Sequence, residues 1–309
     1  MSIVVLGTVA LDTVKTPFGL RRHMLGGSAV HFAMSARLFT KVSLVAVIGE
    51  DFPQKYIHFL HKKGLVLTSL IQGEGKTFKW EGEYKGDLNS ALTLNTELGV
   101  LSAFRPVISA GQRGIKYLFL ANVDQDIQRH LLERMHSPRF VGLDSMNYWI
   151  SHKRKSLLRL LKKVNMYVAN DQEARVLAGE NNLIKAARYL YSCGPRMVLI
   201  KKGEHGVLFL TDKFTPPLRG GAGFIFSIPA YPTHKVIDPT GAGDTFAGGL
   251  MGYLAKANKI NEANIKKGIA YGTVAASFNV EGFGVEATAR LKLNDLEKRM
   301  KKFKGYVTF

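Results

Sequence analysis

The sequence predicts an α/β fold, with a mostly parallel β-sheet that carries helices on both faces. Short apolar, β-branched runs alternate with helical patterns along the chain. The strand candidates lack polar alternation, as expected for a sheet covered on both sides. The chain has 309 residues, 46% of them hydrophobic, which is enough for one large core. We therefore expect a single domain over residues 1–309.

The elements follow one another in an order that favours this fold. Predicted strands are the runs 3–7, 42–49, 116–123, 140–144, 166–170 and 197–203. The spacing of apolar residues predicts helices over 27–38, 52–63, 125–136, 152–163, 171–178, 182–192, 243–257 and 261–278. Strands that alternate with helices are typical of parallel sheets, because each parallel pair needs a crossover.

Residues 76–98 break the pattern by alternating strictly. Phe78, Trp80 and Tyr84 fall on one face of this segment. A β-ribbon with one apolar face is predicted, standing outside the main sheet as a lid, with residues 13–25 adding a strand. An extra hairpin packed on the core is the alternative. The apolar face could stack on a nucleobase, cover a sugar or join two lids in a homodimer.

Composition and charge indicate which partners and which cellular location to expect. The net charge of +19 fits an anionic partner, but the basic residues are dispersed, which favours a solvated surface. A single cysteine, Cys193, excludes an internal disulfide framework. No apolar run approaches the roughly 20 residues that span a bilayer. The N-terminus resembles a strand more than a signal peptide. We expect a cytoplasmic protein with no membrane partner.

The segment DPTGAGDTFAGG, residues 238–249, predicts an anion-binding loop followed by a helix. Gly241 and Gly243 allow a tight turn whose amides converge. The helix that follows adds about half a positive charge at its N-terminus. A phosphate would fit there. Gly248 and Gly249 would allow either close helix packing or approach of a ligand.

Asp244 lies beside this predicted phosphate site. A carboxylate there is electrostatically unfavourable unless the chemistry uses it, for example to accept a hydroxyl proton during phosphoryl transfer. The helix dipole should lower its pKa and make it a weak base. The alternative is an ordinary N-terminal helix cap.

Three segments of the chain together resemble the PfkB/ribokinase family of sugar and nucleoside kinases. The resemblance is carried by DPTGAGDTFAGG, by GGSAVHFAMSARLF (26–39) and by NDQEA (170–174), in the family's order and spacing. It implies a Rossmann-like, ribokinase-like domain with a β-lid over the sugar site. It further implies ATP and Mg²⁺ as cofactors, with a nucleotide and a small sugar or nucleoside as partners.

The resemblance also assigns roles in phosphoryl transfer. Asp244 matches the catalytic base. Gly241, Ala242 and Gly243 match the residues of the anion hole. Asn170 and Glu173 match the pair that organises Mg²⁺.

On the acceptor side, Asp12 matches a carboxylate that binds substrate hydroxyls, and Gly26 and Gly27 match the glycine pair beside it. His31 stands where the family often has Asn, which leaves sugar specificity open. Asp144 and Asn147 end a predicted strand and are further candidates for the substrate cleft.

On the nucleotide side, Lys201, Gly203 and Gly206 resemble the family's glycine turn, and Asn279 lies near its adenine edge. Many relatives bind a monovalent cation such as K⁺ at the positions of Asp238 and Thr240, together with the loop 279–284.

The function predicted from these features is ATP-dependent phosphorylation of a hydroxymethyl group on a sugar or nucleoside, with a slight preference for a ribose-bearing acceptor. A kinase of a plain or phosphorylated hexose or pentose is one alternative. A catalytically silent nucleotide- or nucleic-acid-binding relative is another. The presence of Asp244, Asn170 and Glu173 argues against the silent relative, so a nucleic-acid partner is not expected.

Overall fold

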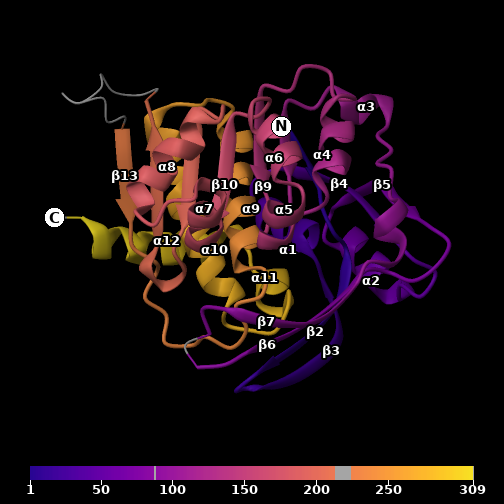
Figure 1. The fold of residues 1–309 in the computed structure, drawn as a ribbon. Coiled ribbons are helices and arrows are strands. Elements are labelled where there is room, and N and C mark those ends of the chain that lie inside the picture. Colours follow the sequence, from indigo (N-terminus) through magenta and orange to yellow (C-terminus); the bar gives the residue numbers. More distant parts are fainter. Residues whose placement is uncertain (87, 213–223, 309) are drawn as a thin grey trace.

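Two β-sheets organise the computed structural model, which describes residues 1–86, 88–212 and 224–308 (Figure 1). The larger sheet has the strand order β13-β12-β11-β10-β9-β8-β1-β4-β5. Its strands are β1 (Ser2–Leu6), β4 (Lys41–Ile48), β5 (Val66–Gln72), β8 (Tyr117–Leu120), β9 (Phe140–Asp144), β10 (Met166–Asn170), β11 (Met197–Lys201), β12 (Val207–Thr211) and β13 (Phe224–Ile228). Neighbours from β5 to β11 pair in parallel, whereas β12 and β13 are added antiparallel.

Helices cover both faces of this sheet, and each face has its own buried apolar cluster. One cluster includes side chains of α1 (Ser28–Ala36), α2 (Gln54–Lys62), α9 (Ala242–Ala257), α10 (Glu262–Asn279), α11 (Glu286–Arg290) and α12 (Leu293–Val307). The other includes side chains of α4 (Gln125–Leu132), α5 (Asn147–His152), α6 (Arg154–Leu161), α7 (Asp171–Ala178) and α8 (Leu183–Ser192). The predicted fold class is confirmed. Within the described ranges, no helix has the length and apolar character needed to cross a bilayer.

The prediction missed β5, β12 and β13. In β5, Thr68 and Ser69 interrupt the apolar run, which hides the strand from a hydrophobicity pattern. Ser69 is nevertheless buried, because its hydroxyl donates to Gln112 Oε1 at 2.6 Å. A polar residue with a partner inside the protein can occupy a strand that faces the core.

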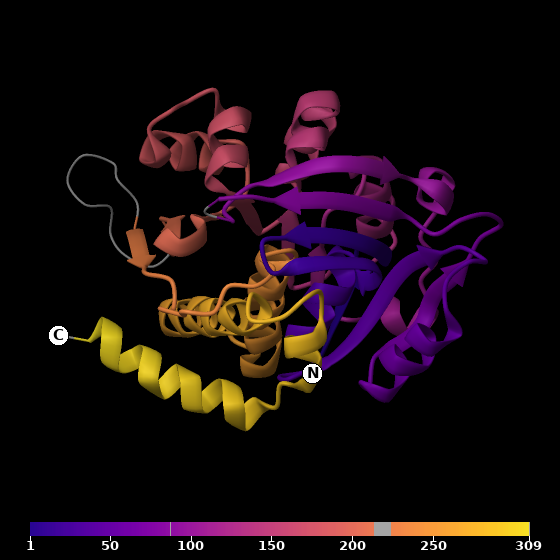
Figure 2. The same ribbon diagram turned by 90° about the horizontal axis from the view of Figure 1, so that it is seen from below.

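The smaller sheet has the strand order β3-β2-β6-β7 and confirms the prediction of a separate second sheet. Its strands are β2 (Ala10–Thr16), β3 (Gly19–Gly26), β6 (Lys79–Tyr84) and β7 (Ala91–Glu97). Seen from below, these strands lie across the end of the molecule where the large sheet's parallel strands finish (Figure 2). Strand β7 forms one edge and is exposed along its whole length.

Helix α9 packs unusually closely against α1 and α10. A side chain on Gly248 would collide with the carbonyl of Phe32 in α1, and one on Gly249 would lie 2.9 Å from Gly272 Cα in α10. Close helix packing is therefore the role of these two glycines. The contact fixes the N-terminus of α9 beside the N-terminus of α1.

Candidate active site

The candidate site lies where the parallel strands end, which is where α/β sheets usually bind ligands. Asp144, Asn170 and Lys201 are the last residues of β9, β10 and β11. Asn170 and Lys201 are also direct neighbours in the sheet register. The N-termini of α1, α7 and α9 open toward the same edge (Figure 1).

The loop before α9 forms a tight turn that needs Gly241. Gly241 has φ +72° and ψ 6°, and the N–H of Ala242 donates to the carbonyl of Pro239 at 3.1 Å. This is the geometry of a type II turn, whose third residue favours glycine. The Ala242 amide is thus engaged inside the turn, so its predicted place in an anion hole gains no support here and stays a prediction. No hydrogen bond of the described residues uses the N–H of Gly243 or Asp244, so these two amides can receive a phosphate.

Asn279 fixes this loop and the start of α9 through hydrogen bonds. It is fully buried, and its side-chain amide donates to the carbonyl of Thr240 at 2.8 Å. Its Oδ1 accepts from Thr245 Oγ1 at 2.9 Å and lies 3.1 Å from His31 Nδ1. The predicted contact of Asn279 with adenine gains no support, because both ends of its amide are already occupied.

His31 lies directly under the turn, since a side chain on Gly241 would collide with its imidazole ring. Because Nδ1 faces the Asn279 oxygen, we assign the hydrogen to Nδ1. Nε2 is buried with no partner among the described residues. Burial lowers the pKa of His31, which favours the neutral ring. Its contact with a substrate stays a prediction.

Asp238 joins the loop to the segment after α10. Its two carboxylate oxygens accept the N–H of Thr240 at 2.9 Å and the N–H of Gly284 at 2.8 Å. The structure thus brings together the segments that the sequence predicted to share a cation site.

Asp12, in β2, lies against the glycine pair, as predicted. The N–H of Gly27 donates to Asp12 Oδ2 at 3.3 Å, and a side chain on Gly26 would collide with that carboxylate. Burial, with smaller contributions from the charges of Asp238 and Asp244, raises the pKa of Asp12 to about 7, although the hydrogen bond from Gly27 opposes the shift. Since no hydrogen bond from a Lys, Arg or His side chain reaches it in the described chain, Asp12 can accept hydrogen bonds from a ligand.

Asn170 and Glu173 form a reciprocal capping box at the start of α7, with two N–H···O bonds of 2.7 Å. These two residues therefore act as an ordinary helix cap. The cap uses Glu173 Oε2 and leaves Oε1 for another partner. Burial, with a smaller contribution from the nearby Asp144 carboxylate, raises the pKa of Glu173 to about 8. A bound cation would oppose both effects.

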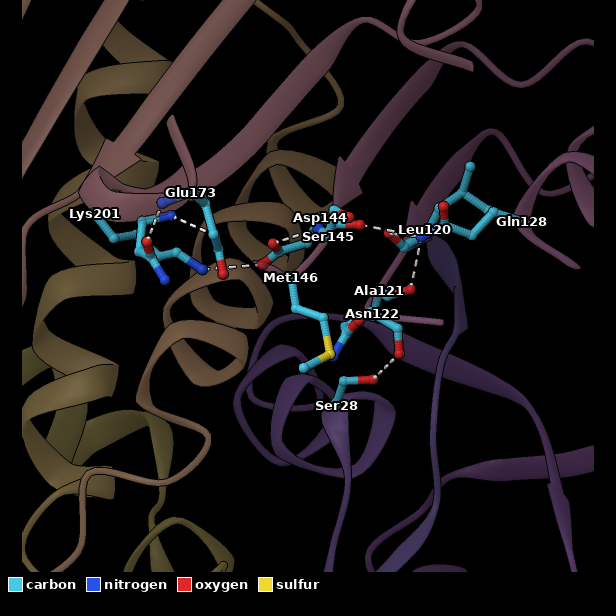
Figure 3. A network of polar contacts seen from close by, with 11 residues as sticks. Ser28, Leu120, Ala121, Asn122, Gln128, Asp144, Ser145, Met146, Glu173 and Lys201 are labelled. Atoms are coloured by element: carbon cyan, nitrogen blue, oxygen red, sulfur yellow. Dashed lines mark hydrogen bonds and ion pairs between the residues drawn. The ribbon is translucent and has the colours of Figure 1, made fainter. Parts of the chain in front are cut away.

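Lys201 and Asp144 form a largely buried ion pair of 3.0 Å at the ends of β11 and β9, beside Glu173 (Figure 3). Asp144 was predicted to bind substrate, but its carboxylate pairs with this ammonium. It does not face the predicted acceptor site around Asp12. Asn147, the other substrate candidate of this segment, begins α5 and makes none of these contacts; its Oδ1 is buried without a partner in the described part of the chain.

The glycine turn after β11 places its two glycines differently. Gly203 begins the short η2 helix (Gly203–His205) and is exposed, so a nucleotide can reach it. A side chain on Gly206 would collide with the carbonyl of Ile228, so Gly206 is needed for backbone packing. Contact of either residue with ATP stays a prediction.

Asp244 lies in the first turn of α9, and its carboxylate has no hydrogen-bond partner among the described residues. Burial and the smaller effect of the Asp144 charge raise its pKa to about 7, with the Lys201 charge opposing them. The prediction of a lowered pKa is therefore wrong, because desolvation exceeds the effect of the helix dipole. A base with a pKa near 7 suits proton transfer at neutral pH.

Sequence reasoning missed several residues that hold the site. Gln128 is fully buried, and its amide donates to the carbonyls of Leu120, Ala121 and Asp144 at 3.3, 2.9 and 3.1 Å (Figure 3). It ties the ends of β8 and β9 together. Nothing in the local sequence around Gln128 marks this role, because its partners are backbone groups.

The smaller sheet also contacts the loop before α9 and the turn after β11. Thr240 Oγ1 donates to the hydroxyl of Tyr84 at 3.4 Å, and the Asn89 amide donates to Glu204 Oε1 at 3.0 Å. Strand β6 and the loop after it therefore reach both the anion-binding loop and the turn after β11.

Comparison with known proteins decides the family. The model of the pfkB family carbohydrate kinases matches residues 4–290. The chain belongs to this family. A cytidine kinase of Thermococcus kodakarensis is 30% identical over 268 residues, which cover 85% of this chain and 91% of the relative.

Solved pfkB-fold kinases match at lower identity and support the fold. Burkholderia thailandensis nucleoside kinase in complex with inosine has a TM-score of 0.78 at 18% identity, covering 98% of this chain and 99% of that one. An E. coli protein described as a ribokinase II, in complex with ATP and Mg²⁺, has a TM-score of 0.78 at 14% identity, covering 97% and 99%. This pfkB-family chain is a carbohydrate or nucleoside kinase.

Proposed function

We propose that this kinase transfers the γ-phosphoryl group of ATP to a hydroxymethyl group of a nucleoside. The observation that carries the proposal is the place of Asp244. In the described part of the chain its carboxylate has no hydrogen-bond partner, and the backbone N–H groups of Gly243 and Asp244 beside it make no hydrogen bond. The carboxylate lies between the half of the site that holds Asp12 and the half that holds Lys201. Such a group can take a proton from an alcohol as a phosphoryl group arrives.

The chemistry follows from these positions. Asp12 accepts hydrogen bonds from acceptor hydroxyls and orients the alcohol, while Asp244 removes its proton. The amides of Gly243 and Asp244, at the positive end of α9, stabilise the negative charge of the phosphoryl group. The lid excludes water and so limits hydrolysis of ATP.

Glu173 and Asn170 are the residues that would hold Mg²⁺, with Glu173 acting through water. The described residues contain no group of three or more His, Cys, Asp or Glu side chains suited to a metal. That fits an ion that keeps waters and takes further ligands from phosphates. Bound Mg²⁺ would neutralise phosphate charge, and it would stabilise the ionised form of Glu173.

Asp238 is the candidate ligand for a monovalent cation such as K⁺. It is fully buried, and no Lys, Arg or His of the described residues forms an ion pair with it. A cation bound by Asp238 and nearby carbonyls would supply the missing positive charge and would brace the loop that carries Thr240.

Trp80 favours a nucleoside over a plain sugar. It is the register partner of Asp12 on the neighbouring parallel strand, so both side chains project from the same face of the lid. The indole lies over Gly82, and its Nε1 donates to Thr93 Oγ1 at 3.2 Å, which fixes the ring plane. The resemblance to a cytidine kinase and an inosine-bound nucleoside kinase also supports this acceptor class.

The exposed edge of the lid is the candidate surface for a homodimer. On β7, Leu92 and Leu94 are 55% and 51% exposed, beside unpaired strand-edge groups. A second copy could cover both. The use of ATP fits the cytoplasmic location expected from the sequence.

The test is a screen of nucleosides and sugars for acceptor-dependent release of ADP with Mg²⁺. We expect nucleosides to outperform ribose and hexoses. With the best nucleoside as acceptor, the variant Trp80→Leu should raise KM about 5- to 150-fold, because base–aromatic stacking contributes about 1–3 kcal/mol. It should leave KM for ribose unchanged.

Phe18→Leu is the matched control, since Phe18 is also an aromatic residue of the lid but lies 60% exposed in the turn before β3. A plain sugar as the best acceptor, or equal effects of Trp80→Leu on both acceptor classes, would contradict the nucleoside assignment.

A further inference from the structure

Lys201 is held in the cleft by an ion pair that stability alone does not explain. The side chains of Lys201 and Asp144 are only 17% and 5% exposed, and their charged atoms are 3.0 Å apart. Removing two charges from water costs about as much as their attraction returns, so a buried pair is weak evidence of stabilisation. A role in binding or chemistry would account for its place at the ends of β9 and β11.

The ammonium group lies over the anion-binding loop. A Cβ on Gly243 would lie 2.8 Å from Lys201 Nζ. The free N–H of Gly243 and the ammonium hydrogens are therefore close to one point in space. A phosphoryl group that accepts from the amide can also reach the ammonium.

Lys201 has donors left for such a ligand. An ammonium carries three hydrogens, and Asp144 Oδ2 is its one hydrogen-bond acceptor among the described residues. Figure 3 shows Lys201 and Asp144 meeting across the ends of their strands, while Gln128 holds Asp144 from the other side through its backbone carbonyl.

The charge of Lys201 is secure. Burial alone would lower its pKa, but Asp144, Glu173 and Asp244 raise it to about 12. Lys201 therefore keeps a positive charge among these carboxyl groups, and that charge can attract a phosphate.

We propose that Lys201 is a catalytic residue whose ammonium binds the transferring phosphoryl group in the transition state, and that Asp144 is a positioning residue that aims it. The proposal rests on the proposed kinase function. The acceptor oxygen forms a bond to the γ-phosphorus as the bond from that phosphorus to the β,γ-bridging oxygen breaks. The electron pair of the broken bond stays on ADP, the hydroxyl proton passes to Asp244, and Lys201 keeps its proton throughout.

Lys201→Met tests this directly, with Lys201→Arg as the conservative variant. We expect Lys201→Met to lower kcat about 10²- to 10³-fold, as loss of one preorganised transition-state donor does, and to change the Kd of ATP less than about fivefold. Lys201→Arg should keep more activity than Lys201→Met. Lys185→Met removes the same charge from an exposed position of α8 and should match the wild type.

Two readouts separate catalysis from a structural role. The ammonium lowers the pKa of Asp244, so its loss should move the acidic limb of the kcat profile to higher pH. Asp12, Asp144 and Glu173 face the same space and remain in all variants. ADP with aluminium fluoride mimics the transferring phosphoryl group. The ratio of the Kd for ADP alone to the Kd for ADP with aluminium fluoride should be at least about tenfold smaller in Lys201→Met than in the wild type.

The aluminium fluoride measurement needs no acceptor, so it tests Lys201 even if the screen finds no nucleoside substrate. Thermal denaturation will show whether Lys201→Met folds. If it does not, kcat and the preference for the aluminium fluoride complex are compared between Lys201→Arg and the wild type instead. A kcat for Lys201→Met within about threefold of wild type, or an unchanged preference for the aluminium fluoride complex, would overturn the proposal.

Discussion

The two halves of the candidate site both bury carboxylates, but among the described residues a Lys or Arg side chain pairs with them in one half alone. On the phosphate side, Asp144 and Glu173 lie around Lys201. On the acceptor side, the Asp12 carboxylate accepts a hydrogen bond only from the backbone N–H of Gly27 within the described ranges. Lys201 thus gives the phosphate half a positive charge that an anion can bind. The acceptor half has an uncompensated hydrogen-bond acceptor, which suits neutral hydroxyl groups.

Asp244 lies between the halves, and its removal should have the largest effect. Asp244→Asn keeps the shape but cannot accept the proton, so kcat should fall about 10²- to 10⁴-fold, while ATP still binds. In the wild type, kcat/KM should fall as the pH drops through about 7, because burial raises the pKa of Asp244 to that value and the base must be ionised.

The matched control is Asp126→Asn. Asp126 also lies in the first turn of a helix, α4, but its side chain is 51% exposed. Steady-state rates and calorimetric binding of ATP would separate the two variants. Near-normal turnover by Asp244→Asn would remove the proton-acceptor role.

Asp12→Asn sharpens the comparison from the acceptor side. Burial raises the pKa of Asp12 from 3.8 to about 7. The folded protein therefore binds a proton there that the unfolded chain releases, and the free energy of unfolding falls as the pH rises from about 4 to 7. At pH 8 the ionised group costs on the order of 1–4 kcal/mol.

We therefore expect Asp12→Asn to raise Tm at pH 8 by a few degrees or more and at pH 5 by much less. KM for the acceptor should rise about 10- to 10³-fold, because hydroxyl groups lose a charged acceptor. Thermal denaturation at both pH values and acceptor kinetics would check this. An equal Tm change at both pH values would show that the carboxylate is not the unfavourable group.

The sequence predicted the layout of the fold better than the interactions inside the cleft. Near-continuous apolar runs such as 42–49 identify a covered parallel sheet, because burial on both faces leaves a local pattern. The pairing of Lys201 with Asp144 spans 57 positions and depends on strand order, which no local pattern contains.

Two features of the loop before α9 were also beyond local reasoning. The Ala242 amide was predicted to bind anions, but the turn that presents the loop consumes it. The pKa of Asp244 was predicted from the helix dipole alone, and the burial that reverses its direction exists only in the folded cleft.

The contact of the lid with the phosphate side gives the smallest expected effect. Tyr84 is buried, its pKa is raised to about 12 by burial, and its hydroxyl accepts from Thr240 Oγ1 at 3.4 Å. Tyr84→Phe removes a long neutral hydrogen bond, which contributes about 0.5–1.5 kcal/mol. KM for the acceptor should rise about 2- to 10-fold through looser closure, with kcat nearly unchanged.

Tyr306→Phe, at a 59% exposed position near the end of α12, is the matched control and should equal the wild type in steady-state assays. A loss of kcat as large as that of Asp244→Asn would place the Tyr84 hydroxyl in the chemistry itself. The acceptor half would then contribute a proton-carrying group as well as a hydrogen-bond acceptor, and the contrast between the two halves would fail. A modest change in KM alone keeps that contrast, because it confines Tyr84 to closing the lid over a site whose cation, Lys201, lies on the phosphate side.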